Sequence, residues 1–330
     1  MKIRRSFVSL FVIAAALVVT AASAQTLTVY SSGPGSLAKA LVAGYQKAHP
    51  GSKIDLFASS TGKVMARLAA EQSNPHADVV ILADWTAGLN LQQQGDVLPY
   101  RPAALLDTVR PELRASGDFV PLGGDMVSIV VNTDVTPKAQ MPKDWFDLTG
   151  PSWKNEITMP DPTLSGTAAD FVLTFVSRFG DKAWTFFQAL KAEGTLWPGP
   201  NAAALNPVEV GSRRVVLAGV GHTALKAQKA GNALALIYPS SGTVLIPRPI
   251  LILKSTKHAA EAKAFVDYAM SDAGQQLVAK ALLIPARQDV APNAVWKGFD
   301  SVPTIKVDWQ KLASEHDSVM SRFRTTILGR

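Results

Sequence analysis

The sequence predicts an α/β protein built on open, mostly parallel sheets with helices on both faces. Residues 26–95 alternate between strand-like and helix-like segments, which is the pattern of a parallel sheet. Residues 77–83 form a continuous apolar stretch, typical of a strand covered on both faces. The chain has 330 residues, which is enough for two lobes of about 150 residues each.

The first 24 residues are predicted to be a secretory signal peptide. Lys2, Arg4 and Arg5 precede an apolar stretch at 7–19, and the small residues 22–24 form a cleavage site. The apolar stretch is short for a membrane span, and no cysteine follows it for lipid attachment. We therefore expect export to the periplasm, with Gln25 as the first mature residue.

The composition of the exported part excludes several classes of protein. The formal net charge of +7 falls to +4 without the three basic residues of the signal peptide, which gives little support for nucleic-acid binding. There are no cysteines, so neither disulfides nor thiolate chemistry is available. A mild positive charge is compatible with attracting a small anion.

The first three strands are predicted at 26–30, 53–58 and 77–83, and helices follow at 36–49, 64–71 and after residue 84. In an open parallel sheet, ligands bind outside the carboxyl ends of the strands. The loops that follow these strands, at 31–35, 59–62 and 84–86, are therefore expected to lie together at one edge.

The segment 59–63 contains Ser60, Thr61 and Gly62 at a strand-to-helix turn. Two interpretations are open. The hydroxyl groups can cap the helix, or the free N–H groups of the helix start can bind an anion.

The second half of the chain has a second helix start that combines hydroxyl residues with a glycine. Ser165, Gly166 and Thr167 precede an apolar helix at 169–179, and another helix is predicted at 182–193. The remaining segments are a loop at 197–201, strands at 125–133, 215–220, 233–238 and 250–253, a helix after 221, and a helix at 259–281 broken near 271–274.

The order of these segments resembles the periplasmic solute-binding proteins of ABC importers, in the group that contains ferric-ion, phosphonate and sugar-phosphate binders. Each motif is short, but their order and spacing extend over about 250 residues. The motifs are residues 27–31, 77–80, 132–134, 161–162, 165–168, 238–239, 242–243, 247–250, 261–268, Ser271 and 274–275.

The resemblance implies a type II binding protein, with two α/β lobes joined by two crossover hinge strands and a ligand held between them. The crossovers would lie near 125–131 and 243–253. Lobe 1 would comprise 25–127 and 247–330, and lobe 2 would comprise 128–246. The partner would be an inner-membrane permease, and we expect a monomer without a cofactor.

One departure from the ferric-ion binders concerns their paired tyrosines. The matching region, 219–223, contains no tyrosine, and the first loop has serines where a histidine ligand would be expected. A hard cation prefers anionic oxygen ligands. The resemblance therefore favours a small anionic solute, a phosphonate or phosphate ester, and no metal is expected; a ferric site with non-standard ligands is the alternative.

The predicted ligand-binding residues are mostly neutral donors. Asp84 could bind a ligand ammonium or cap a helix, Trp85 could cover the ligand or lie in the core, and His222 could face the cleft or the surface. The full set is Ser31, Ser32, Ser60, Thr61, Gly62, Asp84, Trp85, Ser165, Gly166, Thr167, His222 and Tyr238.

An enzyme is the least favoured class. Ser36 to Lys39 and Ser60 to Lys63 both match S-x-x-K, the motif of serine acyl-enzymes. The companion motifs K-T-G and S-D-N are absent, as is G-x-S-x-G. No complete set of catalytic partners is visible, so we predict no catalytic residues.

Overall fold

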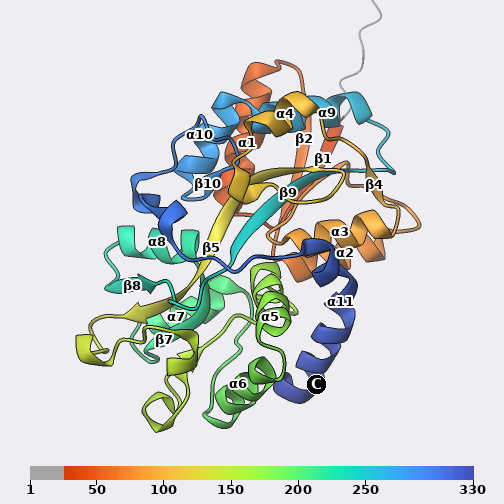
Figure 1. The fold of residues 1–330 in the computed structure, drawn as a ribbon. Helices are drawn as coiled ribbons and strands as arrows, with labels where there is room; N and C mark the ends of the chain where they lie inside the picture. Colours follow the sequence, from red (N-terminus) through yellow and green to blue (C-terminus); the bar gives the residue numbers. More distant parts are fainter. Residues whose placement is uncertain (1–25) are drawn as a thin grey trace, which may run out of the picture.

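The computed structural model describes residues 26–330, which form two α/β lobes (Figure 1). The predicted signal peptide lies outside the described residues. The upper lobe in Figure 1 contains β1 (Thr26–Ser31), α1 (Gly35–Ala48), β2 (Lys53–Ala58), α2 (Thr61–Ala70), β3 (Val79–Ile81), α3 (Trp85–Gln93), β4 (Val97–Leu98), α4 (Ala103–Thr108), α9 (Ala259–Met270), α10 (Asp272–Lys280) and β10 (Ile284–Pro285). The lower lobe contains β6 (Ile157–Thr158), α5 (Gly166–Phe179), α6 (Asp181–Ala192), α7 (Asn201–Glu209), β7 (Val215–Val220), α8 (Gly221–Lys229) and β8 (Leu234–Ile237).

The first three strands of the upper lobe have the predicted parallel order, and the sheet continues with β9 (Leu245–Leu253), which pairs antiparallel with β3. β1 lies between β2 and β3 and pairs in parallel with both. Each strand is followed by a helix, because parallel neighbours need a crossover connection. The carboxyl ends of β1 and β2, and the start of α3 after β3, consequently meet at one edge, as the sequence pattern indicates.

The sheet of the lower lobe is mixed. β6 and β7 pair in parallel, but β5 (Val120–Asn132) runs antiparallel to both β7 and β8. The lower sheet is thus less parallel than predicted, because β5 enters it from the other lobe rather than from a local βαβ unit.

Two strands connect the lobes, in the regions where the sequence predicts the crossovers. Residues 120–126 of β5 pair with β9 (Leu245–Leu253), and residues 127–132 pair with the lower sheet. Figure 1 shows both strands passing between the lobes. We propose the lobe boundary in β5 at Met126 and Val127, where its partner changes. The arrangement is the two-lobe architecture that the resemblance implies.

The helix α11 (Trp309–Arg322) is absent from the sequence prediction and contacts both lobes. It packs against α3 of the upper lobe and α5 of the lower lobe, and it runs down the side of the molecule toward α6 (Figure 1). Phe323, just after it, is fully buried with its ring centroid 5.1 Å from that of Phe187. We therefore propose that the last segment of the predicted lobe 1 range, 247–330, is shared between the two lobes.

The apolar core continues from one lobe into the other. The larger cluster of buried side chains includes Trp85 and Phe119 of the upper lobe, Phe171 and Phe175 of the lower lobe, and Trp309 of α11. A second cluster fills the space between the upper sheet and α1, α9 and α10. Among residues 26–330, no helix is both long and apolar enough to cross a membrane.

Candidate functional site

A cavity of about 400 Å³ lies where the two lobes meet. Residues of both lobes and of β9 line it, so its shape depends on how the lobes approach each other. The lining residues are Ser32, Gly33, Pro34, Ser59, Ser60, Thr61, Lys63, Ala83, Leu164, Ser165, Gly166, Pro200, Asn201, Ala202, His222, Thr223 and Arg248.

Five helices begin at this cavity. The lining contains residues from the first turn of, or directly before, α1, α2, α5, α7 and α8. Each of these helices has at least nine residues, so each carries a dipole with its positive end at the cavity. Free N–H groups and dipoles of this orientation suit an anion.

The upper side of the cavity presents hydroxyl groups in a fixed arrangement. Ser32 Oγ accepts a hydrogen bond from the backbone N–H of Ala83 at 3.0 Å and lies 3.1 Å from Thr61 Oγ1. Ser60 precedes α2 without capping it, and its buried Oγ has no hydrogen-bond partner among the described residues. Ser60 is therefore a free donor at the cavity rather than the helix cap that the alternative interpretation required.

On the lower side, the hydroxyl of Ser165 both caps a helix and orients a neighbour. Its Oγ accepts a hydrogen bond from the N–H of Ala168 at 3.3 Å and donates one to Asn201 Oδ1 at 3.1 Å. Ser165 thus caps α5 and also lines the cavity. Asn201 begins α7, a helix that was not predicted, since residues 197–201 read as a loop rich in Pro and Gly.

Gly62 and Gly166, the glycines of the two predicted helix starts, lie where the two lobes touch. A Cβ atom added to Gly166 would lie 1.9 Å from Asp84 Oδ1, and one added to Gly62 would lie 2.8 Å from the carbonyl oxygen of Thr163. The N–H of Gly62 donates to the carbonyl of Leu164 at 3.4 Å. Glycine is required at both positions because the opposite lobe occupies the space of a side chain.

Arg248 is the buried cation of the cavity. It is 2% exposed, and its Nη2 donates to Asp125 Oδ2 at 3.3 Å and to Thr167 Oγ1 at 3.5 Å, whereas its Nε has no partner among the described residues. Burial lowers the pKa of the guanidinium, and the nearby Asp125 and Asp84 oppose this effect. An arginine stays protonated in proteins, so Arg248 provides a fixed positive charge.

Neither Arg248 nor Lys63 was assigned to the site from the sequence. Arg248 lies in β9, which is apolar and buried at almost every other position, and a charge in such a strand was the signal that could have identified it. Lys63 follows Gly62 on the first turn of α2 and lines the cavity.

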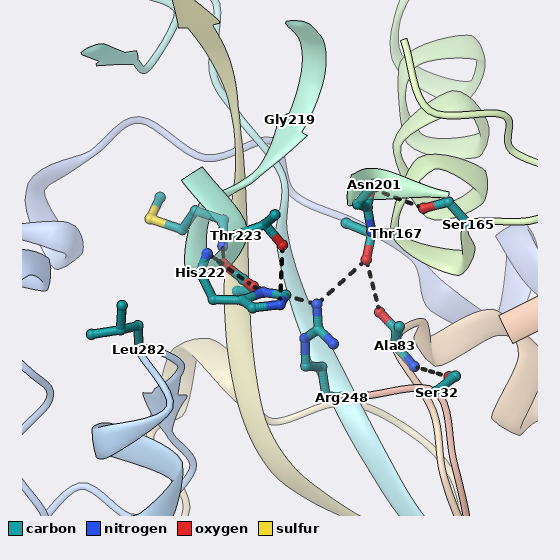
Figure 2. A network of polar contacts seen from close by, with 12 residues as sticks. Ser32, Ala83, Ser165, Thr167, Asn201, Gly219, His222, Thr223, Arg248 and Leu282 are labelled. Atoms are coloured by element: carbon teal, nitrogen blue, oxygen red, sulfur yellow. Dashed lines mark hydrogen bonds and ion pairs between the residues drawn. The ribbon is translucent and has the colours of Figure 1, made fainter. Parts of the chain in front are cut away.

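A chain of hydrogen bonds connects Arg248 and His222 to both lobes (Figure 2). Arg248 donates to Thr167, which donates to the carbonyl of Ala83 at 3.4 Å, and the N–H of Ala83 donates to Ser32. On its other side, Arg248 shares Asp125 with His222. Figure 2 shows Arg248 between Thr167 and His222. His222 therefore belongs to the cavity, as predicted.

Two predicted binding residues do not line the cavity, because Trp85 lies in the core and Tyr238 packs against it. Trp85 is fully buried, with its ring centroid 4.7 Å from that of Phe119 and its Nε1 donating to the carbonyl of Ser116 at 2.8 Å. Tyr238 packs against the second apolar cluster. The interpretation of Trp85 as a cover for the ligand is wrong.

Ser31 and Thr167 lie directly behind the lining. Ser31 is 1% exposed, and its Oγ accepts from the N–H of Gly33 at 3.2 Å, which shapes the loop before α1. Thr167 is fully buried and acts through Arg248. Both residues support the cavity without facing it.

Asp84 lies in a second cavity, of about 260 Å³, rather than in the first. Thr61, Leu164 and Gly166 line both cavities and form the wall between them. Asp84 Oδ1 accepts from Thr61 Oγ1 at 3.3 Å. Asp84 therefore does not line the first cavity, and its predicted contact with a ligand ammonium stays a prediction.

A second buried carboxylate, Asp170 of α5, lies close to Asp84. Asp170 Oδ2 accepts from the N–H of Trp85 at 2.8 Å, and Oδ1 accepts from Thr86 Oγ1 at 2.5 Å, so a residue of the lower lobe caps α3 of the upper lobe. Burial raises the pKa of Asp84 to about 6, and burial together with the Asp84 charge raises the pKa of Asp170 well above its ordinary value.

The donors of the first cavity suit an anion better than a hard cation. Within residues 26–330, its lining contains no Asp, Glu or Tyr, and no cluster of three or more His, Asp or Glu side chains could hold a metal ion. Ferric iron prefers anionic oxygens. Helix N-termini, hydroxyl groups, Lys63 and Arg248 instead supply positive charge and hydrogen-bond donors.

The chain matches the model of the bacterial extracellular solute-binding protein family over residues 74–314. It is 27% identical to a probable ABC transporter periplasmic-binding protein of Sinorhizobium fredii, over 96% of this chain and 92% of that protein. It is also 27% identical to an Fe(3+)-binding periplasmic protein of Serratia marcescens, over 78% of each chain.

Two solved structures share the fold at lower identity. The periplasmic binding protein AfuA from Actinobacillus pleuropneumoniae, with fructose-6-phosphate bound, superposes with a TM-score of 0.85 at 23% identity, over 92% of this chain and 98% of that one. Iron-bound HitA from Pseudomonas aeruginosa superposes with a TM-score of 0.78 at 23% identity, over 90% and 98%.

Proposed function

This chain belongs to the bacterial extracellular solute-binding proteins and is the substrate-binding component of an ABC importer, and we propose that its ligand is a small phosphate ester such as a sugar phosphate. The family is not enzymatic, so the two S-x-x-K segments are not catalytic. We place the protein in the periplasm, where related binding proteins act, and we propose that it delivers the ester to a permease of the inner membrane.

The observation that carries this proposal is the convergence of five helix N-termini on a cavity that also contains Arg248 and Lys63. A phosphate group has several oxygen atoms to accept hydrogen bonds and carries negative charge, so it matches N–H groups, hydroxyls and a guanidinium at once. Ser60 Oγ and Arg248 Nε, both buried without a partner, would be satisfied by such a ligand.

The size of the cavity supports an ester rather than inorganic phosphate. About 400 Å³ lies in the range of sites for small organic molecules. Asn201, His222 and Thr223 add polar side chains that can bind hydroxyl groups of a sugar. The matching structure with bound fructose-6-phosphate is consistent with a ligand of this class, whereas a phosphonate has no specific support.

Isothermal titration calorimetry of the exported protein, after denaturation and refolding to remove bound solutes, tests the proposal. We expect micromolar or tighter binding of a hexose phosphate and at least about 100-fold weaker binding of the parent hexose, since the charged hydrogen bonds would be lost. Tighter binding of an aminoalkyl phosphonate, or of the unphosphorylated hexose, would contradict it.

Ferric iron is the second candidate, because several relatives are ferric-binding proteins. The described lining lacks carboxylate and phenolate ligands, so an iron site would have to use His222 and a bound anion. Titration with ferric citrate, monitored by absorbance and metal analysis, decides between the two: stoichiometric iron bound without a phosphate ester would favour this candidate.

A further inference from the structure

We propose that Asp125 is the positioning residue that orients Arg248 and His222 toward the ligand, without contacting the ligand itself. Asp125 does not line the cavity, whereas both basic residues do. The inference rests on the proposed function for its ligand, a phosphate ester, but its geometry can be tested on the free protein.

Asp125 lies in the crossover strand β5 and is fully buried. Its Oδ2 is 2.5 Å from His222 Nδ1 and accepts from Arg248 Nη2 at 3.3 Å. Its Oδ1 accepts from the N–H of Met126 at 2.9 Å and from the N–H of His222 at 3.2 Å. A buried carboxylate needs such partners, and here two of them are the basic side chains of the cavity.

The contact with His222 determines which ring nitrogen faces the ligand. A histidine that donates from Nδ1 to a carboxylate directs Nε2 away from it. Nε2 lies 3.2 Å from Thr223 Oγ1, a residue of the cavity lining. Asp125 therefore fixes both the tautomer and the ring orientation with which His222 meets a ligand hydroxyl or phosphate oxygen.

The contact with Arg248 leaves part of the guanidinium for the ligand. Nη2 is held by Asp125 and Thr167, while Nε has no partner among the described residues. A single carboxylate on one side of the guanidinium thus restrains the side chain without consuming all of its donors.

The start of α8 is built to admit this carboxylate. A Cβ atom at Gly221 would lie 2.7 Å from Asp125 Oδ1 and 2.4 Å from the Trp296 ring, so a side chain there would displace one of them. The absence of a side chain lets the N–H of His222 reach Asp125. Asp125 thus joins the crossover strand β5 to Arg248 of the second crossover strand, β9, and to His222 of the lower lobe.

Asp125→Asn tests the role, with glucose 6-phosphate as the calorimetric probe. We expect a loss of affinity of about 10- to 100-fold, the range found for buried partners that orient metal-binding histidines. Asp78→Asn is the matched control: Asp78 is 4% exposed, 3.2 Å from His258 Nδ1, and away from the cavity. It should leave the affinity unchanged.

A double-mutant comparison separates positioning from an independent effect. In a protein that carries both His222→Ala and Arg248→Ala, Asp125→Asn should change the affinity by less than about two-fold, because Asp125 acts through these two residues. An undiminished effect in that background, or wild-type affinity of Asp125→Asn itself, would overturn the proposal.

The free protein provides a readout that does not depend on the ligand. Long-range ¹H–¹⁵N NMR spectra should show His222 protonated at Nδ1 in the wild type, and this state should be lost in Asp125→Ala, which has no acceptor, but kept in Asp78→Asn. A wild-type His222 without a proton on Nδ1 would refute the positioning role. If the NMR result holds but no phosphate ester binds the wild type, the proposed function fails instead.

Discussion

The two cavities on either side of the wall formed by Thr61, Leu164 and Gly166 differ in charge. The first contains Arg248, Lys63 and five helix N-termini, and no carboxylate among its described lining. The second contains Asp84 and Asp317, together with His316 and Arg324 from the C-terminal segment. The wall therefore separates a cavity lined by basic groups from a cavity that contains carboxylates.

The comparison shows that the direction of a side chain, more than its place in the sequence, decides which cavity it lines. Asp84 follows a strand end at the same sheet edge as Ser32 and Ser60, but its carboxylate turns behind Thr61 instead of into the first cavity. A carboxylate inside the first cavity would repel a phosphate group. Its placement in the second cavity keeps the first one favourable for anions.

Removal of Arg248, the buried cation that distinguishes the first cavity from the second, should have the largest effect on ligand affinity. Arg248→Ala is expected to weaken binding of glucose 6-phosphate by about 100-fold or more, since hydrogen bonds to charged groups contribute roughly 1.5–3 kcal/mol each. Calorimetry measures this loss. Arg101→Ala, whose guanidinium binds backbone carbonyls of residues 115 and 117, is the control that should bind normally; equal losses would argue against a specific role.

A side chain in the wall should disturb both cavities. Gly166→Ala places a methyl group 1.9 Å from Asp84 Oδ1, and relief of such an overlap costs roughly 1–3 kcal/mol. We expect about 10- to 100-fold weaker binding and a lower melting temperature. Gly35→Ala, at the start of α1, meets only the Cβ of Ala58 at 4.0 Å and should change neither; wild-type behaviour of Gly166→Ala would show that the wall is not rigid.

The carboxylates of the second cavity predict a dependence of stability on pH. The pKa of Asp84, 3.8 in its ordinary environment, is raised to about 6 by burial, so between these values the folded state holds more protons than the unfolded state. Stability should therefore fall by about 1–3 kcal/mol as pH rises from 4 to 6. Asp170 on α5 adds to the effect, while His316 on α11 and Arg248 on β9 oppose it.

Urea denaturation of Asp84→Asn across this range measures the contribution. The variant should be more stable than the wild type above pH 6 and should show a smaller slope between pH 4 and 6. Asp55→Asn, on exposed β2, should retain the wild-type slope. A wild-type slope for Asp84→Asn would mean that the carboxyl group is ionised in the folded protein.

The smallest expected effect concerns Lys63, because a flexible ammonium at the cavity edge is partly screened by solvent. Lys63→Gln should weaken binding of glucose 6-phosphate about 3- to 10-fold at low salt, and the difference from wild type should shrink as ionic strength increases. Lys39→Gln on the exposed face of α1 provides the control. A salt-independent loss would indicate a direct hydrogen bond as the main contribution.

The sequence was informative where local chemistry determines structure. Strand and helix alternation identified the parallel sheet, and hydroxyl–glycine pairs identified the helix starts at Ser60 and Ser165, both at the cavity. The two regions predicted as crossovers overlap β5 and β9, which pair with each other. These features depend on short-range patterns of polarity and backbone freedom that a single sequence contains.

The sequence was less informative where long-range packing decides. Trp85 and Asp84 follow a strand end, yet Phe119 and Thr61, distant in the chain, determine where their side chains point. Arg248 was missed because its partner, Asp125, lies 123 residues away. The helices α7 and α11 were missed because Pro and Gly at 198–200 and the polar composition of 310–318 conceal them.

The position of α11 has a kinetic consequence. Because it packs against α3 of one lobe and α5 of the other, we expect that separation of the lobes requires α11 to leave one of these helices. The apolar contacts broken in that step contribute to the barrier for opening. We therefore expect α11, which lies outside the hinge strands, to contribute to how long a captured solute stays enclosed.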